Sequence, residues 1–170
     1  MKKLTYIFAL ALIFAGINSN VKAQGISIGG GISYGLDIEE IGIQLSGTYG
    51  LNEDMRLGAD IVYYLIGDES FFGEEISSTA LEVNFNYNYI FYNENDLIIY
   101  GLGTLGIHYF SSSFSFNGFS ESFSDTEVGL GLGAGLEYDL GSVKLYAEPR
   151  LFLSGFDQFQ LNAGVRVPIN

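Results

Sequence analysis

The sequence has no cysteine, a single histidine and only 16% charged residues, and each shortage excludes a class of protein. Without cysteine there can be no disulfide scaffold, thiol nucleophile, cysteine-ligated metal or lipid anchor on an N-terminal cysteine. One histidine gives little basis for an imidazole metal site, so we expect neither a metal nor a cofactor. The formal net charge of −13 argues against nucleic acid as a partner, because binding to phosphates depends on Lys and Arg.

Apolar, aromatic and glycine residues are abundant instead. Hydrophobic residues make up 48% of the 170 residues and aromatic residues 15%, and there are 23 glycines. This composition argues against intrinsic disorder, which requires few aromatic residues and a high charge density. A chain of this length is normally a single domain.

The first 23 residues have the features of a secretory signal peptide. Lys2 and Lys3 precede an apolar run over 4–17, and a polar stretch then ends in Val21-Lys22-Ala23. The run is shorter than the roughly 20 apolar residues of a membrane-spanning helix. We therefore predict export and cleavage after Ala23, which leaves a mature domain over 24–170. Its only Lys and Arg residues are Arg56, Lys144, Arg150 and Arg166.

Along the mature chain, apolar and polar residues alternate with a period of two. From Leu81 to Tyr89, for example, every second residue is apolar and the residues between them are Glu or Asn. Such alternation predicts strands with one apolar and one polar face. The expected strands lie at 25–35, 40–51, 55–65, 79–90, 97–110, 126–138, 143–153 and 158–168.

The connections between these strands differ in length at the two edges of the sheet. Those at 52–54, 91–96 and 139–142 are short, whereas 66–78 and 111–125, on the opposite edge, are long. An all-β fold with this pattern is typical of an eight-stranded antiparallel up-and-down transmembrane β-barrel. Continued alternation over 111–125 predicts a hairpin that extends beyond the membrane, with Asn117-Gly118 at its tip. We also expect a bulge near 97–100 and a local distortion at Pro149.

Charged residues on the polar face indicate that this face is the barrel interior. All four cations of the mature chain lie on it among carboxylates, as expected where buried charges must be paired. The predicted charge network of the lumen consists of Arg56, Asp60, Glu82, Glu127, Glu137, Lys144, Glu148, Arg150 and Arg166. We expect these carboxylates to be structural and ionised, and the lumen to be filled by side chains.

Small residues on the polar face also favour a narrow interior. With Leu140-Gly141 as a turn tip, Gly135 is expected opposite Tyr146 and Gly131 opposite Arg150. Pairing of glycine with bulky neighbours fills a small barrel.

Aromatic residues are expected to form two belts at the membrane–water boundaries. One belt, near the short turns, contains Tyr49, Tyr87, Tyr89, Phe91, Tyr92 and Tyr138. The other, near the long connections, contains Tyr34, Tyr63, Tyr64, Tyr109, Phe110, Phe156 and Phe159.

In these features the chain resembles the small eight-stranded outer-membrane barrels of Gram-negative bacteria, the OmpA/OmpX-type and porin-family β-barrel domains. The resemblance covers 24–170 and rests on the signal peptide, the alternating strands, the charged lumen and the long loops. It implies a bacterial outer-membrane location, contact with lipid and lipopolysaccharide, and a monomer. One departure is the C-terminus, because such barrels usually end in an aromatic residue and this chain ends in Asn170.

The hypothesis we favour for function is a non-enzymatic envelope protein that has a structural role or interacts at the cell surface through its loops. The loops 66–78 and 111–125 contain the candidate surface-interaction residues Phe71, Phe72, Phe114, Phe116 and Phe119. An exposed β edge with aromatic residues can add a strand from an extracellular protein or other ligand. No calcium-loop spacing is present in these acidic loops.

Two other hypotheses remain open at this stage. One is a narrow porin-like channel for small solutes. The other is a lipid-modifying enzyme with His108 as base and one of Ser111, Ser112 and Ser113 as nucleophile, although the His-x-Ser spacing of the related deacylases is absent. The G-x-G-x-x-G pattern at 101–106 is attributed to chance, because no helix is expected after it.

Overall fold

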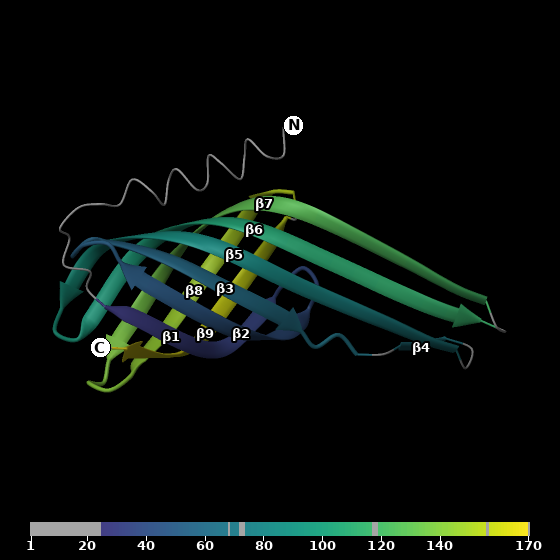
Figure 1. The fold of residues 1–170 in the computed structure, drawn as a ribbon, viewed down its shortest axis with the longest axis horizontal. Coiled ribbons are helices and arrows are strands. Elements are labelled where there is room, and N and C mark those ends of the chain that lie inside the picture. The colour runs from purple at the N-terminus through teal and green to yellow at the C-terminus, as the bar shows by residue number, and fades with distance from the viewer. Residues whose placement is uncertain (1–24, 68, 72–73, 117–118, 156, 170) are drawn as a thin grey trace.

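The protein is a closed, all-antiparallel β-barrel in the computed structural model (Figure 1). The structure describes residues 25–67, 69–71, 74–116, 119–155 and 157–169, and the predicted signal peptide lies outside them. The strands are β1 (Ile26–Gly35), β2 (Glu40–Gly50), β3 (Met55–Tyr64), β4 (Glu69–Phe71), β5 (Glu74–Glu94), β6 (Leu97–Phe116), β7 (Phe119–Asp139), β8 (Lys144–Ser154) and β9 (Gln158–Ile169). Among the described residues, no helix has the length and apolarity needed to cross a bilayer.

Eight of these strands close the barrel in an up-and-down order. Each pairs with its neighbours in the chain, β1 pairs with β9, and β3 pairs with β5 from Met55↔Tyr89 to Tyr64↔Ala80. The short strand β4 pairs only with the outer part of β5, so it adds to the sheet beyond the closed part. The predicted fold class is therefore confirmed.

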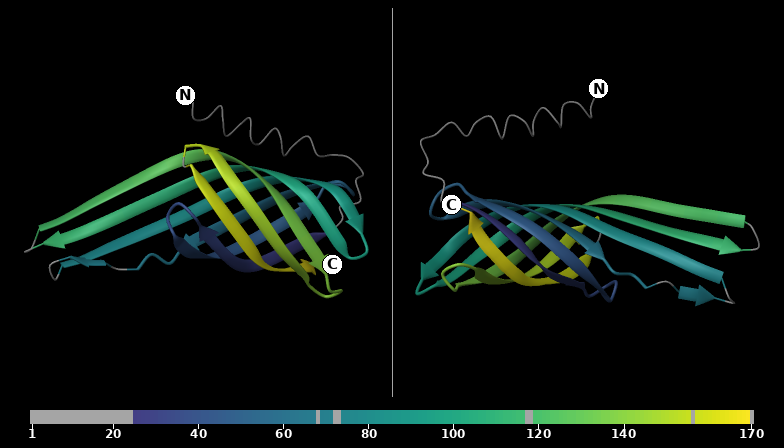
Figure 2. Two further views of the ribbon diagram at one scale, coloured as in Figure 1. Left: turned by 180° about the vertical axis from the view of Figure 1, so that it is seen from behind. Right: turned by 60° about the horizontal axis from the view of Figure 1, so that its bottom comes forward.

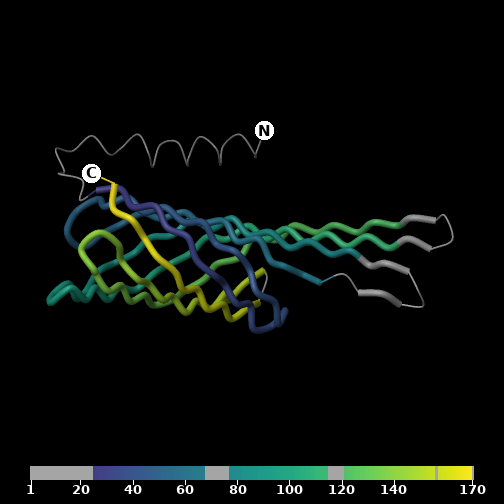
Figure 3. The backbone as a smooth tube through the Cα atoms, turned by 90° about the horizontal axis from the view of Figure 1, so that it is seen from below, coloured from purple at the N-terminus to yellow at the C-terminus, as the bar shows by residue number. Residues whose placement is uncertain are grey.

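Strands β5, β6 and β7 are about twice as long as the other five strands of the closed barrel and project from one end of it (Figures 1 and 2). The pairing of β6 with β7 continues to Phe116↔Phe119, and the pairing of β5 with β6 continues to Ile76↔Phe114. Both described termini lie at the opposite end, as Figure 3 also shows. We call the part of this sheet over residues 74–79, 111–116 and 119–125 the projecting sheet.

Two sequence predictions about the long connections have different outcomes. The hairpin expected over 111–125 is confirmed, although its predicted tip at Asn117-Gly118 lies outside the described residues. The prediction that 66–78 is only a loop is wrong, because β4 and the first residues of β5 pair with each other there. Backbone hydrogen bonds to the extended β6 hold the beginning of β5 in the sheet.

The short turn between β5 and β6 is tighter than its sequence indicated. Strand β5 continues to Glu94, which pairs with Leu97, so Asn95 and Asp96 alone form the turn. Both have positive φ, 51° and 66°, a conformation that Asn and Asp tolerate and that two-residue hairpin turns require. The expected connection at 91–96 is therefore mostly strand.

The two faces of the barrel have opposite character. Outward-facing Leu45, Phe91, Leu130 and Leu132 are each about 60% exposed, whereas inward-facing Asn84, Gln160 and Glu137 are fully buried. A soluble domain would bury its apolar side chains. This barrel buries polar and charged ones and presents a continuous apolar surface, as a lipid-facing barrel does.

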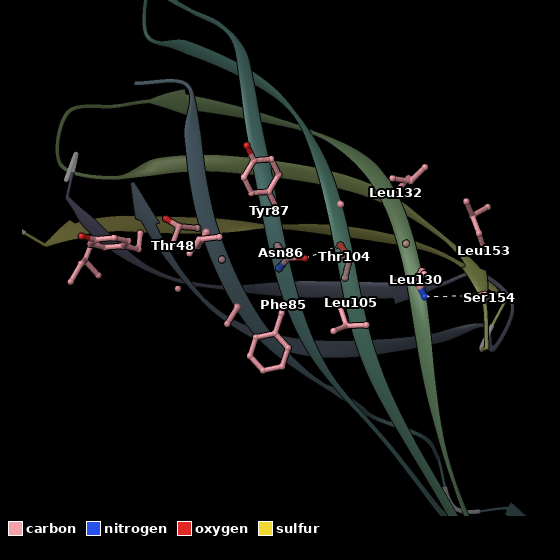
Figure 4. A pocket seen from close by; sticks show the side chains of 18 residues that line it. Thr48, Phe85, Asn86, Tyr87, Thr104, Leu105, Leu130, Leu132, Leu153 and Ser154 are labelled. Atoms are coloured by element: carbon pink, nitrogen blue, oxygen red, sulfur yellow. Dashed lines mark hydrogen bonds between the residues drawn. The ribbon is translucent and has the colours of Figure 1, made fainter. Parts of the chain in front are cut away.

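A wide apolar groove of about 1150 Å³ crosses the outer surface from β2 to β8 (Figure 4). Phe85, Tyr87, Leu105, Leu130 and Leu132 line it, and each is at least 39% exposed. In a bilayer this surface would be in contact with acyl chains.

Irregularities in the ladder lie close to the two places where the sequence predicted them, but they differ in detail. The register shifts between Ile90 and Tyr92, so the bulge lies on β5, opposite the predicted region of β6. The β7–β8 register is the same on both sides of Pro149, and the shift in this pair lies at Leu130/Gly131. Pro149 causes no bulge, but the β7–β8 pairing passes from Gly133↔Arg150 to Leu136↔Ala147, so the ladder is interrupted at the proline as expected. On its other side the proline pairs in register with Leu161 of β9.

The predicted register of the β7–β8 hairpin is wrong by two residues. Glu137 pairs with Tyr146, Gly133 with Arg150 and Gly131 with Phe152. The connection is longer than the predicted two-residue tip, because Leu140 N–H donates to Val143 O across it and Asp139 pairs with Lys144. A shift by two leaves every side chain on its predicted face.

Gly135 shows how small residues make room in the lumen. It pairs with Tyr100 of β6, and a Cβ atom at position 135 would overlap the Tyr100 ring. The predicted match of glycine with a bulky neighbour is present, but the neighbour is Tyr100 rather than Tyr146.

Candidate functional site: the filled lumen and its outer mouth

Six charged side chains of alternating sign form a chain across the middle of the lumen. Arg56 Nη1 lies 2.8 Å from Glu137 Oε2, and Arg166 then pairs with both Glu137 and Glu148. Arg150 continues the chain, with Nη2 2.6 Å from Glu148 Oε2 and Nη1 2.9 Å from Asp60 Oδ2. We call Arg56, Glu137, Arg166, Glu148, Arg150 and Asp60 the ionic chain.

Neutral polar groups add hydrogen bonds to the carboxylates of this chain. Asp60 accepts hydrogen bonds from the amide groups of Gln44 (3.1 Å), Asn84 (3.0 Å) and Asn86 (2.6 Å). Tyr100 donates its hydroxyl hydrogen to Glu148 and accepts from Arg166 Nη1 at 3.0 Å. Buried charges are tolerated only when paired and bonded in this way.

Aromatic rings and a small apolar cluster fill the remaining space. The Arg166 guanidinium lies 4.1 Å from the centre of the Tyr146 ring, and that of Arg56 lies 4.6 Å from the Tyr100 ring. Tyr100 also packs with Ile90, Ile98 and Leu102 towards the short-turn end. This cluster explains why residues 97–100 are apolar on both faces.

A second polar layer lies nearer the projecting sheet and is centred on Glu82. Glu82 accepts hydrogen bonds from Tyr64 Oη at 3.0 Å and from Gln160 Nε2 at 2.7 Å. His108 Nδ1 lies 3.2 Å from Glu82 Oε1, and its ring meets Phe152 edge-on with centroids 4.6 Å apart. All of these side chains are at most 6% exposed.

The structure separates three predicted members from the ionic chain. Lys144 lies at the turn end, where its Nζ is 3.4 Å from Asp139 Oδ2. Glu82 belongs to the second layer, and Glu127 lines the cavity at the outer mouth. Arg56, Asp60, Glu137, Glu148, Arg150 and Arg166 are brought together.

Sequence reasoning placed Tyr146 in the lumen but missed Tyr64, Tyr100 and the amides there. Tyr64 was assigned to an aromatic belt but is 2% exposed and points into the lumen. The signal for Asn84, Asn86 and Gln160 was present, because they alternate with apolar residues. For Tyr64 and Tyr100 there was no such signal, because tyrosine suits both an interfacial belt and a hydrogen-bonded interior.

The proposed pairing of His108 with a serine nucleophile lacks geometric support. His108 faces the interior beside Glu82, whereas Ser112 Oγ lies 3.2 Å from Ser78 Oγ in the projecting sheet. His108 and Glu82 thus form an acid–base pair. Ser112, however, lies four residues beyond His108 along an extended strand, which corresponds to roughly 13 Å. The segment 101–106 is part of β6, as expected for a chance match to the nucleotide-binding pattern.

The candidate aromatic residues of the loops are only partly described. Phe114 is 38% exposed on the projecting sheet. Phe71, Phe116 and Phe119 lie in β4, β6 and β7, where the structure describes the backbone alone, and Phe72 lies outside the described residues.

The comparisons with solved structures identify the fold. The Neisserial surface protein A is 19% identical, with a TM-score of 0.57 over 86% of this chain and 99% of that chain. The N-terminal barrel of Pseudomonas aeruginosa OprF is 14% identical, with a TM-score of 0.64 over 88% and 98%. The attachment invasion locus protein Ail of Yersinia pestis is 23% identical, with a TM-score of 0.55 over 86% and 99%. Ail has also been solved with the heparin analogue sucrose octasulfate.

No protein-family model and no curated protein sequence matches the chain. The structural neighbours are small outer-membrane β-barrels, and the closed eight-stranded sheet has the same architecture. The chain therefore has the fold of the small eight-stranded outer-membrane β-barrels.

Proposed function

We propose that this protein is a non-enzymatic, monomeric barrel of the bacterial outer membrane that displays its projecting sheet for interaction at the cell surface. The observation that carries the proposal is the length of that sheet. Residues 111–116 alone extend β6 by roughly 20 Å at about 3.3 Å per residue. In this proposal the segment 1–23 is a signal peptide cleaved after Ala23, and the projecting sheet is extracellular.

The free edge of β7 supports this proposal. In the described residues, β7 pairs with β8 only from Leu130 to Asp139, and Ser154 and Gly155 lie against Val128 and Gly129. The backbone before Val128 therefore pairs with β6 alone. An extended peptide can add to such an edge through main-chain hydrogen bonds. The acidic residues Glu121, Asp125 and Glu127 along it discourage pairing between copies and favour a basic partner.

The filled lumen supports a display role over solute passage. The ionic chain crosses the interior, and its members Asp60, Glu137, Glu148, Arg150 and Arg166 are at most 3% exposed. An eight-stranded barrel encloses a space just wide enough for its own side chains. Contact with lipid and lipopolysaccharide belongs to the same proposal, through the apolar outer surface.

The ligand bound by Ail does not transfer to this chain on the basis of charge. Sucrose octasulfate is a polyanion, which requires cations for recognition. The segments 36–39, 66–78, 111–125 and 154–157 contain no Lys or Arg. The partner we propose is therefore not a sulfated polysaccharide.

Removal of the projecting hairpin is expected to abolish surface binding without unfolding the barrel. Ser111 and Ser124 pair directly, so an Asn-Gly turn can replace residues 112–123. We expect bacteria that express the intact protein to adhere to matrix-coated surfaces several-fold better than cells with an empty vector, and the hairpin variant to lose this gain.

Gel mobility before and after heating verifies that both proteins are folded in the outer membrane. Equal adhesion by the two folded proteins would contradict the display role, as would no gain from the intact protein.

A further inference from the structure

A cavity of about 600 Å³ opens at the mouth of the barrel beneath the projecting sheet. Its walls come from β2, β3, β5, β6, β7 and the connections that follow β1 and β3. Ile38, Leu81, Phe110 and Phe123 make these walls largely apolar. A space of this size accommodates a small molecule or one or two amino-acid side chains.

The floor of the cavity carries a buried carboxylate without a permanent cation. Glu82, Tyr64 and His108 form it, and Glu82 is 2% exposed. The hydrogen-bond donors around Glu82 are the Tyr64 hydroxyl and the amides of Gln160 and Asn84, with the His108 imidazole 3.2 Å away. Glu82 thus differs from Glu137 and Glu148, each of which has two arginines.

Further carboxylates surround this opening. Glu40, Asp125 and Glu127 line the cavity together with Glu82. All four Lys and Arg residues of the segment 24–170 are paired elsewhere, Arg56, Arg150 and Arg166 in the ionic chain and Lys144 with Asp139. A recess lined by one sign of charge concentrates oppositely charged ligands.

The arrangement suits an organic cation better than a metal ion. Across the described ranges, no three His, Asp or Glu side chains lie close enough together to hold a metal. The lining instead combines the carboxylates with apolar and aromatic residues, including Tyr109, Phe110 and Phe123, and His108 lies between Glu82 and Glu127 in the sheet. An ammonium group on an aliphatic stem matches both the carboxylates and the apolar lining. The ammonium group can form charge-assisted hydrogen bonds and cation–π contacts, and the stem can pack against the apolar residues.

We propose that the outer mouth is a binding site for an alkylammonium group, with Glu127 and Asp125 at the rim and Glu82 at the floor. The same chemistry is found in a free aliphatic diamine and in the lysine side chain of a peptide. The site shares Asp125 and Glu127 with the β7 edge, but it binds a small amine through side chains, whereas strand addition uses the main chain. Amine binding is therefore measured without adhesion, and the two proposals can fail separately.

Calorimetric titration of the folded full-length barrel in zwitterionic micelles tests this site. The probe is 1,6-diaminohexane, and the matched neutral control is 1,6-hexanediol. We expect saturable binding of the diamine, weakening with added salt, and no binding of the diol. The variant Glu127→Gln should bind the diamine about tenfold more weakly, which corresponds to about 1.4 kcal/mol, and Asp125→Asn should also weaken it.

The matched substitution Glu94→Gln, at the opposite end of the barrel, should leave the affinity unchanged. Titration with Nα-acetyl-lysine amide separates the two sources: binding as tight as that of the diamine indicates a peptide side chain, and binding of the diamine alone indicates a free amine. The proposal is overturned if the diol binds as well as the diamine, if the folded Glu127→Gln and Asp125→Asn variants both retain full affinity, or if neither amine binds.

Discussion

Replacing Arg150 by methionine is expected to lower the free energy of unfolding by about 3–5 kcal/mol, the cost typical of breaking a buried ion pair. Arg150 is 2% exposed and bridges Asp60 and Glu148. Without it, Glu148 retains Arg166 and Tyr100, whereas Asp60 retains only amide donors. The cost arises because a carboxylate would be left buried without a cation.

Urea unfolding of the barrel from lipid vesicles, followed by circular dichroism, measures this loss. The control is Lys144→Met, because the Lys144–Asp139 pair has side chains that are 22% and 31% exposed. Such pairs contribute at most about 1 kcal/mol. Adding Asp60→Asn to the Arg150→Met variant should restore part of the stability, since it removes the unpaired anion. Equal losses for Arg150→Met and Lys144→Met would show that the ionic chain has no special structural role.

Placing an arginine at Leu132 is expected to cost about 2–4 kcal/mol, as charged side chains do at the middle of a bilayer. Leu132 is 60% exposed and lies on β7 midway between Thr126, which pairs with Tyr109, and Tyr138. Tyr109 and Tyr138 belong to the two predicted aromatic belts and are 40% and 45% exposed, so position 132 is expected to be central between the membrane boundaries. In water, a leucine that is this exposed could be replaced by arginine at little cost.

The measurement is again unfolding from vesicles. The matched control on the same strand is Tyr138→Arg, which should cost only about 0–1 kcal/mol because it lies at the boundary. A depth dependence of this kind arises only from a bilayer. Equal costs at 132 and 138 would argue against the membrane position inferred from the belts.

Much of the fold could be predicted because strand periodicity and face assignment depend on local sequence. The alternation around Leu81 and Leu130 placed each side chain on its observed face, and the inward position of Arg150 and Arg166 followed from it. Features that depend on three-dimensional distances could not be predicted in this way. The β7–β8 register depends on hydrogen bonds across the 140–143 connection, which shift the pairing by two residues without changing the alternation.

The composition of the site was harder to predict than the fold. Charged residues on one face indicated a network, but not that Lys144 reaches only Asp139 while Arg56 reaches Glu137. Tyr64 and Tyr100 were not distinguishable from the tyrosines of the belts. Five separate stretches of the chain form the cavity at the mouth, so no local sequence pattern predicted it.

The most direct test of the central claim, an apolar face in lipid around a polar interior, uses a tryptophan at position 132. The chain has no tryptophan, so Leu132→Trp introduces a single reporter on the outer surface, and Phe152→Trp introduces one inside, where Phe152 is 1% exposed. In vesicles with brominated acyl chains, we predict strong quenching of the Leu132→Trp emission and much weaker quenching of the Phe152→Trp emission. Quenching of the Leu132→Trp emission by aqueous iodide, but not by brominated lipid, would contradict the account.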